Sequence, residues 1–199
     1  MKKHFVAAAF LALAASSSMA AVITFDSLAR NDAGLGVVTA YEEAGFLVTG
    51  NMGTIGSQFP GAYAGSPALF IGAETLAATL AKVDGGTFSL NAIDLSPLAP
   101  SWYPGRANVT FTGNVHGGGT VTQSFTVGST LGFETFKFTG FDKLDSVSWI
   151  QEAPSHQFDN IVVAESAAES AAVPEPGTLA LFGVALAGIG ALRRKASKA

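Results

Sequence analysis

The chain has 199 residues, no cysteine and a formal net charge of −4 at pH 7, which excludes disulfide bonds, thiolate metal sites and cysteine nucleophiles. Six of its eleven Lys and Arg residues lie near the two ends, so residues 21–172 hold five cations against fourteen carboxylates, or about −9. This acidic balance argues against nucleic acid and against an anionic membrane surface as partners.

The first twenty residues have the pattern of a cleavable export signal. Lys2 and Lys3 form a positive start, residues 5–15 form an apolar core, and Ser18-Met19-Ala20 offers small residues where a signal peptidase reads. We therefore expect signal peptidase to cleave after Ala20. An uncleaved N-terminal anchor is the alternative, which the short, alanine-rich apolar core disfavours.

Residues 21–163 have the pattern of one all-β domain. Short apolar or alternating runs are separated by clusters of Gly, Pro, Asn and Asp, and no long stretch shows a helical period. The expected strands cover residues 22–25, 37–41, 46–49, 76–82, 88–95, 109–112, 121–127, 135–139, 146–150 and 158–163. Short strands at regular spacing predict an antiparallel β-sandwich or barrel.

Two features predict local geometry within this domain. The apolar alternation in residues 88–95 changes face between Ala92 and Ile93, which a bulge near Asn91 or a strand buried on both faces would explain. Before this strand, Asp84-Gly85-Gly86 predicts a tight hairpin turn, because glycine adopts positive φ at little cost.

Two loops are candidate binding sites. Residues 51–67 are rich in small residues, Gly and Pro, and predict a long surface loop packed by Phe59 and Tyr63. Within residues 97–106, Trp102, Tyr103 and Arg106 lie among prolines. Exposed aromatic rings stack on sugars and an adjacent Arg can bond hydroxyls, whereas the plainer alternative is that Trp102 covers the end of the core.

The histidines give no support for catalysis. His116 opens a His-Gly-Gly-Gly run like the oxyanion loop of esterases, but the chain has no Gly-x-Ser-x-Gly elbow, and the flanking strands predict a hairpin turn. His116 and His156 are the only histidines left after export, too few for a three-histidine zinc site. We expect both at the surface.

Calcium is the only cofactor that the sequence allows us to name, and its signal is weak. Asp26 ends the first expected strand, and Asp159 and Asn160 open the last one. Terminal strands of sandwiches often meet, so these oxygens could converge on a hard cation. The alternative, that these side chains cap strand ends, is the stronger one, and no EF-hand run is present.

The chain after the domain divides into a spacer and an anchor. Residues 164–172, AESAAESAA, form an acidic linker. Pro174-Glu175-Pro176 then precedes an uncharged apolar run over residues 178–192 and a basic tail over residues 193–199. Fifteen residues give a helix of about 22 Å, which also allows a buried core helix, but the prolines and the cations favour a membrane span with a cytoplasmic C-terminus.

This tail closely resembles the PEP-CTERM sorting signal in its Pro174-Glu175-Pro176 motif, its short apolar helix with glycines and its basic end with Arg193 and Arg194. The resemblance covers residues 173–199 and implies recognition by an exosortase, a membrane-embedded, cysteine protease-like enzyme of Gram-negative bacteria. It implies processing near the Pro-Glu-Pro motif after transient anchoring in the inner membrane. An ordinary C-terminal anchor is the alternative.

The body also resembles the extracellular jelly-roll domains common among PEP-CTERM proteins. The resemblance lies in ITFD at 23–26, FSLNAIDL at 88–95, VTFTG at 109–113 and FDNIVV at 158–163. It implies a jelly-roll-like sandwich, and since such domains are often compared with carbohydrate-binding modules, it favours an extracellular polysaccharide as a partner. We expect an exported, non-enzymatic surface or matrix protein, with a secreted carbohydrate-binding module as the second hypothesis and a hydrolase of unrecognised site as the third.

Overall fold

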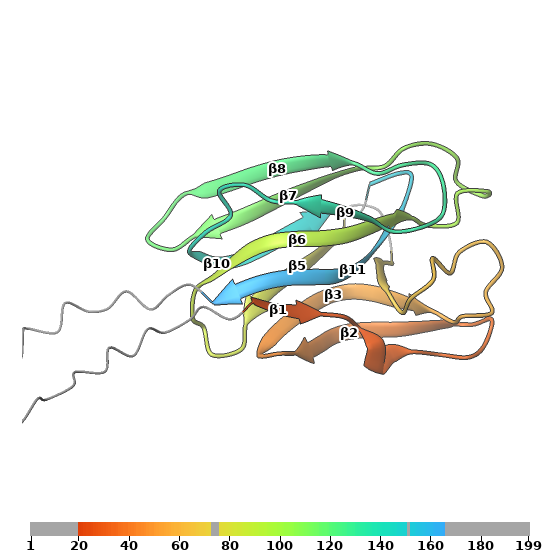
Figure 1. Cartoon of the computed structure of the whole chain (residues 1–199), viewed down its shortest axis with the longest axis horizontal. Coiled ribbons are helices and arrows are strands. Elements are labelled where there is room, and N and C mark those ends of the chain that lie inside the picture. Colours follow the sequence, from red (N-terminus) through yellow and green to blue (C-terminus); the bar gives the residue numbers. More distant parts are fainter. Residues whose placement is uncertain (1–19, 73–75, 151, 166–199) are drawn as a thin grey trace, which may run out of the picture. The chain divides into compact units, whose positions relative to one another are not determined.

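The computed structural model describes residues 20–72, 76–150 and 152–165, which form an all-β domain (Figure 1). A single turn of 3₁₀ helix, η1 (Asp26–Leu28), follows the first strand. The strands are β1 (Ala20–Ile23), β2 (Leu35–Glu43), β3 (Phe46–Ile55), β4 (Leu69–Ile71), β5 (Ala77–Lys82), β6 (Phe88–Pro97), β7 (Asn108–Val115), β8 (Thr120–Thr126), β9 (Glu134–Lys137), β10 (Leu144–Ile150) and β11 (His156–Glu165).

Most of the export signal and the whole sorting tail, with the expected membrane helix at 178–192, lie outside the described residues. Among the residues that are described, no helix has the length and apolar character needed to cross a membrane.

The strands pair antiparallel and form two layers. One layer contains β2, β3, β5, β10, β7 and β8 in that order, and the other contains β1, β11, β6 and β9. Strand β4 pairs with both β3 and β11, and Leu144 of β10 pairs with Phe88 of β6, so the layers are joined into one hydrogen-bonded network. The expected jelly-roll-like β-sandwich is confirmed.

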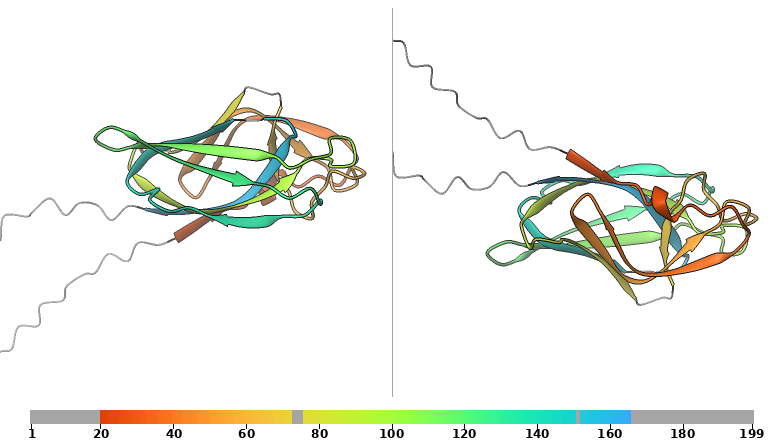
Figure 2. Two further views of the ribbon diagram at one scale, coloured as in Figure 1. Left: turned by 90° about the horizontal axis from the view of Figure 1, so that it is seen from above. Right: turned by 90° about the horizontal axis from the view of Figure 1, so that it is seen from below.

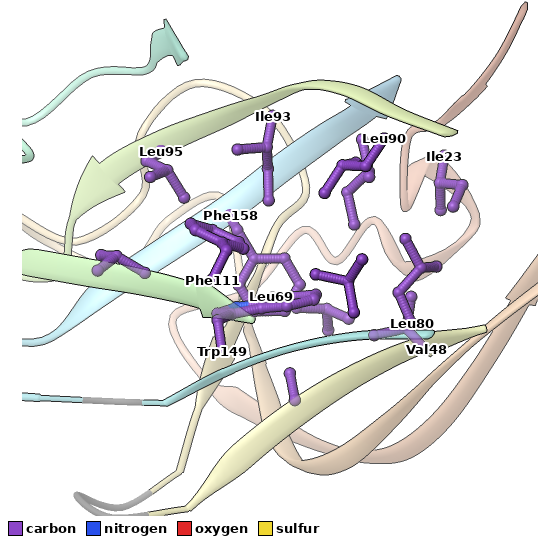
Figure 3. Packing of buried hydrophobic residues seen from close by; sticks show 14 of the residues in the cluster. Ile23, Val48, Leu69, Leu80, Leu90, Ile93, Leu95, Phe111, Trp149 and Phe158 are labelled. Carbon is purple, nitrogen blue, oxygen red and sulfur yellow. The ribbon is translucent and has the colours of Figure 1, made fainter. Parts of the chain in front are cut away.

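The core lies between the layers and combines aliphatic side chains with a group of aromatic rings (Figure 3). Trp149 of β10 meets Phe158 of β11 edge to face, with ring centroids 5.0 Å apart. The ring centroid of Phe111 of β7 lies 5.3 Å from that of Trp149, its cross-strand neighbour in the same layer. Each fully buried aromatic side chain contributes about 2–3 kcal/mol, which lets a domain without disulfides rely on packing alone.

Several expected boundaries are wrong. Strand β3 continues to Ile55, so the loop expected at 51–67 begins only after it, and β4 was not expected at all. The turn at 84–86 forms, with Gly85 at φ +73° and its N–H donating to the Lys82 carbonyl at 3.2 Å. However, β5 and β6 lie in different layers and do not pair, so this turn crosses the sandwich and is not a hairpin.

The expected bulge near Asn91 is present. Val162 pairs with Ala92 and Val163 pairs with Leu90, which leaves Asn91 as an extra residue in β6. Strand β11 carries a compensating irregularity between Asp159 and Val162. These two bulges let β6 bury residues of both parities, because each one shifts the alternation of faces by one residue.

The two ends of the domain lie side by side (Figure 2). Ala20 of β1 pairs with Ala164 of β11, so the first two residues of the expected linker, Ala164 and Glu165, belong to the sheet. The Glu43 carboxylate secures β1 to β2, since it accepts the N–H groups of Thr24 at 2.7 Å and Phe25 at 3.2 Å. The first and last described residues of the domain therefore lie at the same end of the sandwich.

Candidate functional site

The two loops expected as binding sites meet around one cavity of about 250 Å³. They are the β3–β4 loop (residues 56–68) and the β6–β7 loop (residues 98–107). Most residues of the cavity lining are aliphatic or aromatic; the lining comprises Leu35, Ile55, Phe59, Ala62, Phe70, Ile71, Gly72, Leu98, Ala99, Trp102, Tyr103 and Ser155. The sequence predicted each loop separately, and the fold brings them together.

Aromatic side chains form the mouth of this cavity. Trp102 and Tyr103 are 58% and 56% exposed, although both belong to its lining. The backbone N–H groups of Trp102 and Tyr103 donate to the Ala99 carbonyl at 2.9 and 3.1 Å, so a tight turn fixes the backbone that carries these two side chains. The Phe59 ring meets Trp102 edge to face at 5.7 Å. Arg106, the third residue expected here, is exposed and does not line the cavity.

A buried glutamine of β11 ties both loops to the sheet. The Gln157 side-chain amide donates to the Ala62 carbonyl at 2.9 Å in one loop and to the Pro97 carbonyl at 3.1 Å beside the other. The Leu98 N–H also donates to the Ser155 carbonyl at 2.8 Å. Sequence reasoning missed Gln157, because its role appears only when the loops are folded over β11. These bonds fix the cavity walls before any ligand arrives.

The residues expected to bind calcium are only partly brought together. Asp159 pairs with Asp94 across β11 and β6, and Asn160 donates its side-chain amide to Asp94 at 2.9 Å. Asp159 is buried beneath the β3–β4 loop, where the Ser66 hydroxyl donates to it. Burial, reinforced by Asp94 and Asp26, raises the pKa of Asp159 to about 6. Among the described residues, no three acidic or histidine side chains group in a way that could hold a metal ion.

The two histidines differ sharply in their surroundings. His116 is exposed in the β7–β8 hairpin, as expected, and its Nδ1 lies 2.8 Å from Asp145. His156 is fully buried, so its expected surface position is wrong. Neither ring nitrogen of His156 has a hydrogen-bond partner among the described residues, and burial lowers its pKa to about 4. A neutral, enclosed imidazole of this kind cannot reach a substrate.

A comparison with known protein families identifies the sorting motif in the C-terminal tail. Residues 172–195 match the model of the PEP-CTERM protein-sorting motif, which confirms the expected sorting signal. No curated protein matches the chain.

Similar solved structures include two carbohydrate-binding modules. A family 29 module from Piromyces equi has 11% identity and a TM-score of 0.43, covering 77% of this chain and 95% of that chain. The C-terminal family 22 module of Clostridium thermocellum Xyn10B has 15% identity and a TM-score of 0.41, covering 74% and 94%. Identities and scores this low support no conclusion about a ligand.

Proposed function

We propose that this chain is an exported, non-catalytic protein that an exosortase processes at its C-terminus and that then resides at the cell surface or in the extracellular matrix. The match of residues 172–195 to the PEP-CTERM sorting motif carries this proposal. The chain is the substrate of the processing chemistry and supplies no catalytic group to it.

The order of events follows from the arrangement of signals along the sequence. Signal peptidase removes residues 1–20, the apolar run at 178–192 holds the chain in the inner membrane, and the cations from Arg193 onward stay cytoplasmic. Cleavage near Pro174-Glu175-Pro176 then frees the domain from its anchor. The acidic spacer keeps this motif accessible by separating it from the folded sandwich.

Mass spectrometry of the mature C-terminus tests the proposal. In a host with an exosortase, we expect the mature chain to end near residues 174–176 and to lack Arg193 and Arg194. Replacing both Pro174 and Pro176 by Ala should leave the tail attached, whereas Glu169→Gln in the spacer should change nothing. A mature protein that keeps Arg193 and Arg194 in such a host would refute exosortase processing.

A second candidate function is contact with a glycan at the cavity mouth. The specific observation is that Trp102 and Tyr103 remain more than half exposed beside a preformed cavity. Large exposed aromatic rings that rim a pocket commonly mark ligand sites, and their apolar faces stack on sugar rings. Binding in a glycan array that disappears in Trp102→Ala but persists in Val83→Ala, a change at another exposed apolar residue, would support this function.

A further inference from the structure

We propose that the cavity accepts an O-acetyl group of a neutral polysaccharide, while the sugar ring that bears this group lies against Trp102 at the mouth. This inference rests on the glycan-contact candidate and specifies its ligand. The acetyl group would be the part of the ligand that enters the interior, and the hydroxyl-rich remainder would stay in water.

The chemistry of the walls disfavours a bare sugar ring in the interior. Among the described lining residues only Trp102, Tyr103 and Ser155 have polar side-chain atoms; the first two belong to the exposed mouth, and none of the three is charged. The Ala62 carbonyl is taken by Gln157 and the Ser155 carbonyl by Leu98. A sugar ring buried here would bring more hydroxyls than these few groups can pair, and each hydroxyl left without a partner weakens binding by about tenfold or more.

The size of the cavity suits a small apolar substituent. An engineered apolar cavity of about 150 Å³ binds benzene, so the 250 Å³ here exceeds what an acetyl group needs. The acetyl methyl would contact apolar side chains such as Ile55 and Leu98, which are part of the lining. An acetyl carbonyl can accept a hydrogen bond from the Ser155 hydroxyl, which is the polar side chain of the lining that does not belong to the aromatic mouth.

Charge favours a neutral polymer. The domain and its linker, residues 21–172, carry a net charge of about −9, and the cavity lining supplies no cation to a carboxylate. A uronic-acid polymer would therefore be repelled at long range and unpaired at short range. Acetylation adds apolar surface to a sugar without adding charge, which matches both properties of the site.

The test compares one polymer in two forms, acetylated glucomannan and the same sample after mild alkaline deacetylation. We expect the purified full-length chain to bind the acetylated form at least ten times more tightly. Ala62→Leu, which fills the cavity, should reduce this preference to about onefold while binding to the deacetylated form remains. Ser155→Leu fills the same space from a half-buried position, so it repeats the test if Ala62→Leu fails to fold.

Two controls separate the claims. Ala77→Leu, at an exposed position on β5, should keep the full preference. Trp102→Ala should weaken binding to both polymers alike. Equal affinity of the unchanged protein for both forms, or a preference that survives cavity filling, would overturn the acetyl inference and leave glycan contact standing. Failure to bind either form would overturn glycan contact together with this inference, without touching the sorting function.

Discussion

His156 and Asp159, two buried residues of β11, should make opposite contributions to the pH dependence of stability, so that these contributions nearly cancel. His156 has a folded-state pKa of about 4 against an ordinary 6.5, so the stability it contributes above pH 6.5 is lost as the pH falls towards 4. Asp159 has a folded-state pKa of about 6 against an ordinary 3.8, so its burial destabilises the fold at neutral pH. That cost is relieved as the pH falls from 6 towards 3.8.

The two magnitudes are similar. At 1.36 kcal/mol per pKa unit, the pKa shift of His156 lowers the free energy of unfolding by about 3 kcal/mol as the pH falls. The pKa shift of Asp159 raises it by about 3 kcal/mol over nearly the same pH range. Between pH 6 and 4 the unfolded chain takes up a proton at His156, while the folded chain takes one up at Asp159. Their contributions to the pH slope therefore nearly cancel in the unchanged protein.

Single substitutions should reveal the separate contributions of His156 and Asp159 to the pH dependence of stability. Relative to the unchanged protein, His156→Leu should gain about 3 kcal/mol of unfolding free energy as the pH falls from 6.5 to 4, and Asp159→Asn should lose a similar amount between pH 6 and 4. Urea unfolding followed by tryptophan fluorescence measures both, because Trp149 is buried against Phe158. If both variants track the unchanged protein in parallel from pH 7 to 4, the assignment of buried titrating groups is refuted.

Three further changes probe the framework around the site. Glu43→Ala should destabilise the domain by about 2 kcal/mol and speed hydrogen exchange at Thr24 and Phe25, directly after β1, because their N–H groups lose their acceptor, while Glu42→Ala at an exposed position of β2 should not. Gly53→Ala should cost about 1–3 kcal/mol in urea unfolding, because its Cβ would lie 2.4 Å from the Phe70 ring; an unchanged midpoint would contradict this packing. Gln157→Leu should leave the Ala62 carbonyl unpaired, while the Pro97 carbonyl keeps its bond from Ser96, and should make the β3–β4 loop cleavable by protease; equal resistance would show that the glutamine does not hold this loop.

The fold class could be predicted because the long strands show an alternating apolar and polar pattern in their own residues. Val109 and Phe111 alternate with polar neighbours in β7, and this period of two survives in the structure with one face buried. Strand β4 could not be predicted, since its three residues, Leu69–Ile71, are too few to show a period. Its existence depends on β3 and β11, which pair with it on either side.

The burial of His156 escaped prediction for a related reason. In β11, residues 156–159 are all buried, because the core covers one face and the β3–β4 loop covers the other. A loop distant in sequence supplies this second cover, and no local pattern around His156 indicates it. The same cover explains why Gln157 and Asp159 have partners near residues 62 and 66, which no short motif could indicate.

The course of β11 also determines how the domain would bear mechanical load. This strand begins beside the cavity wall at Ser155 and runs ten residues, about 30 Å, to the point where the chain leaves the domain. It lies between β1 and β6, with hydrogen bonds on both sides. If a polymer pulls at the cavity against a tether beyond Glu165, the force acts along β11 and shears many bonds at once. Because a sheared strand loads its hydrogen bonds at the same time, a surface protein built in this way would resist the pull of flowing liquid. A strand pulled away from one end would instead lose its hydrogen bonds one after another.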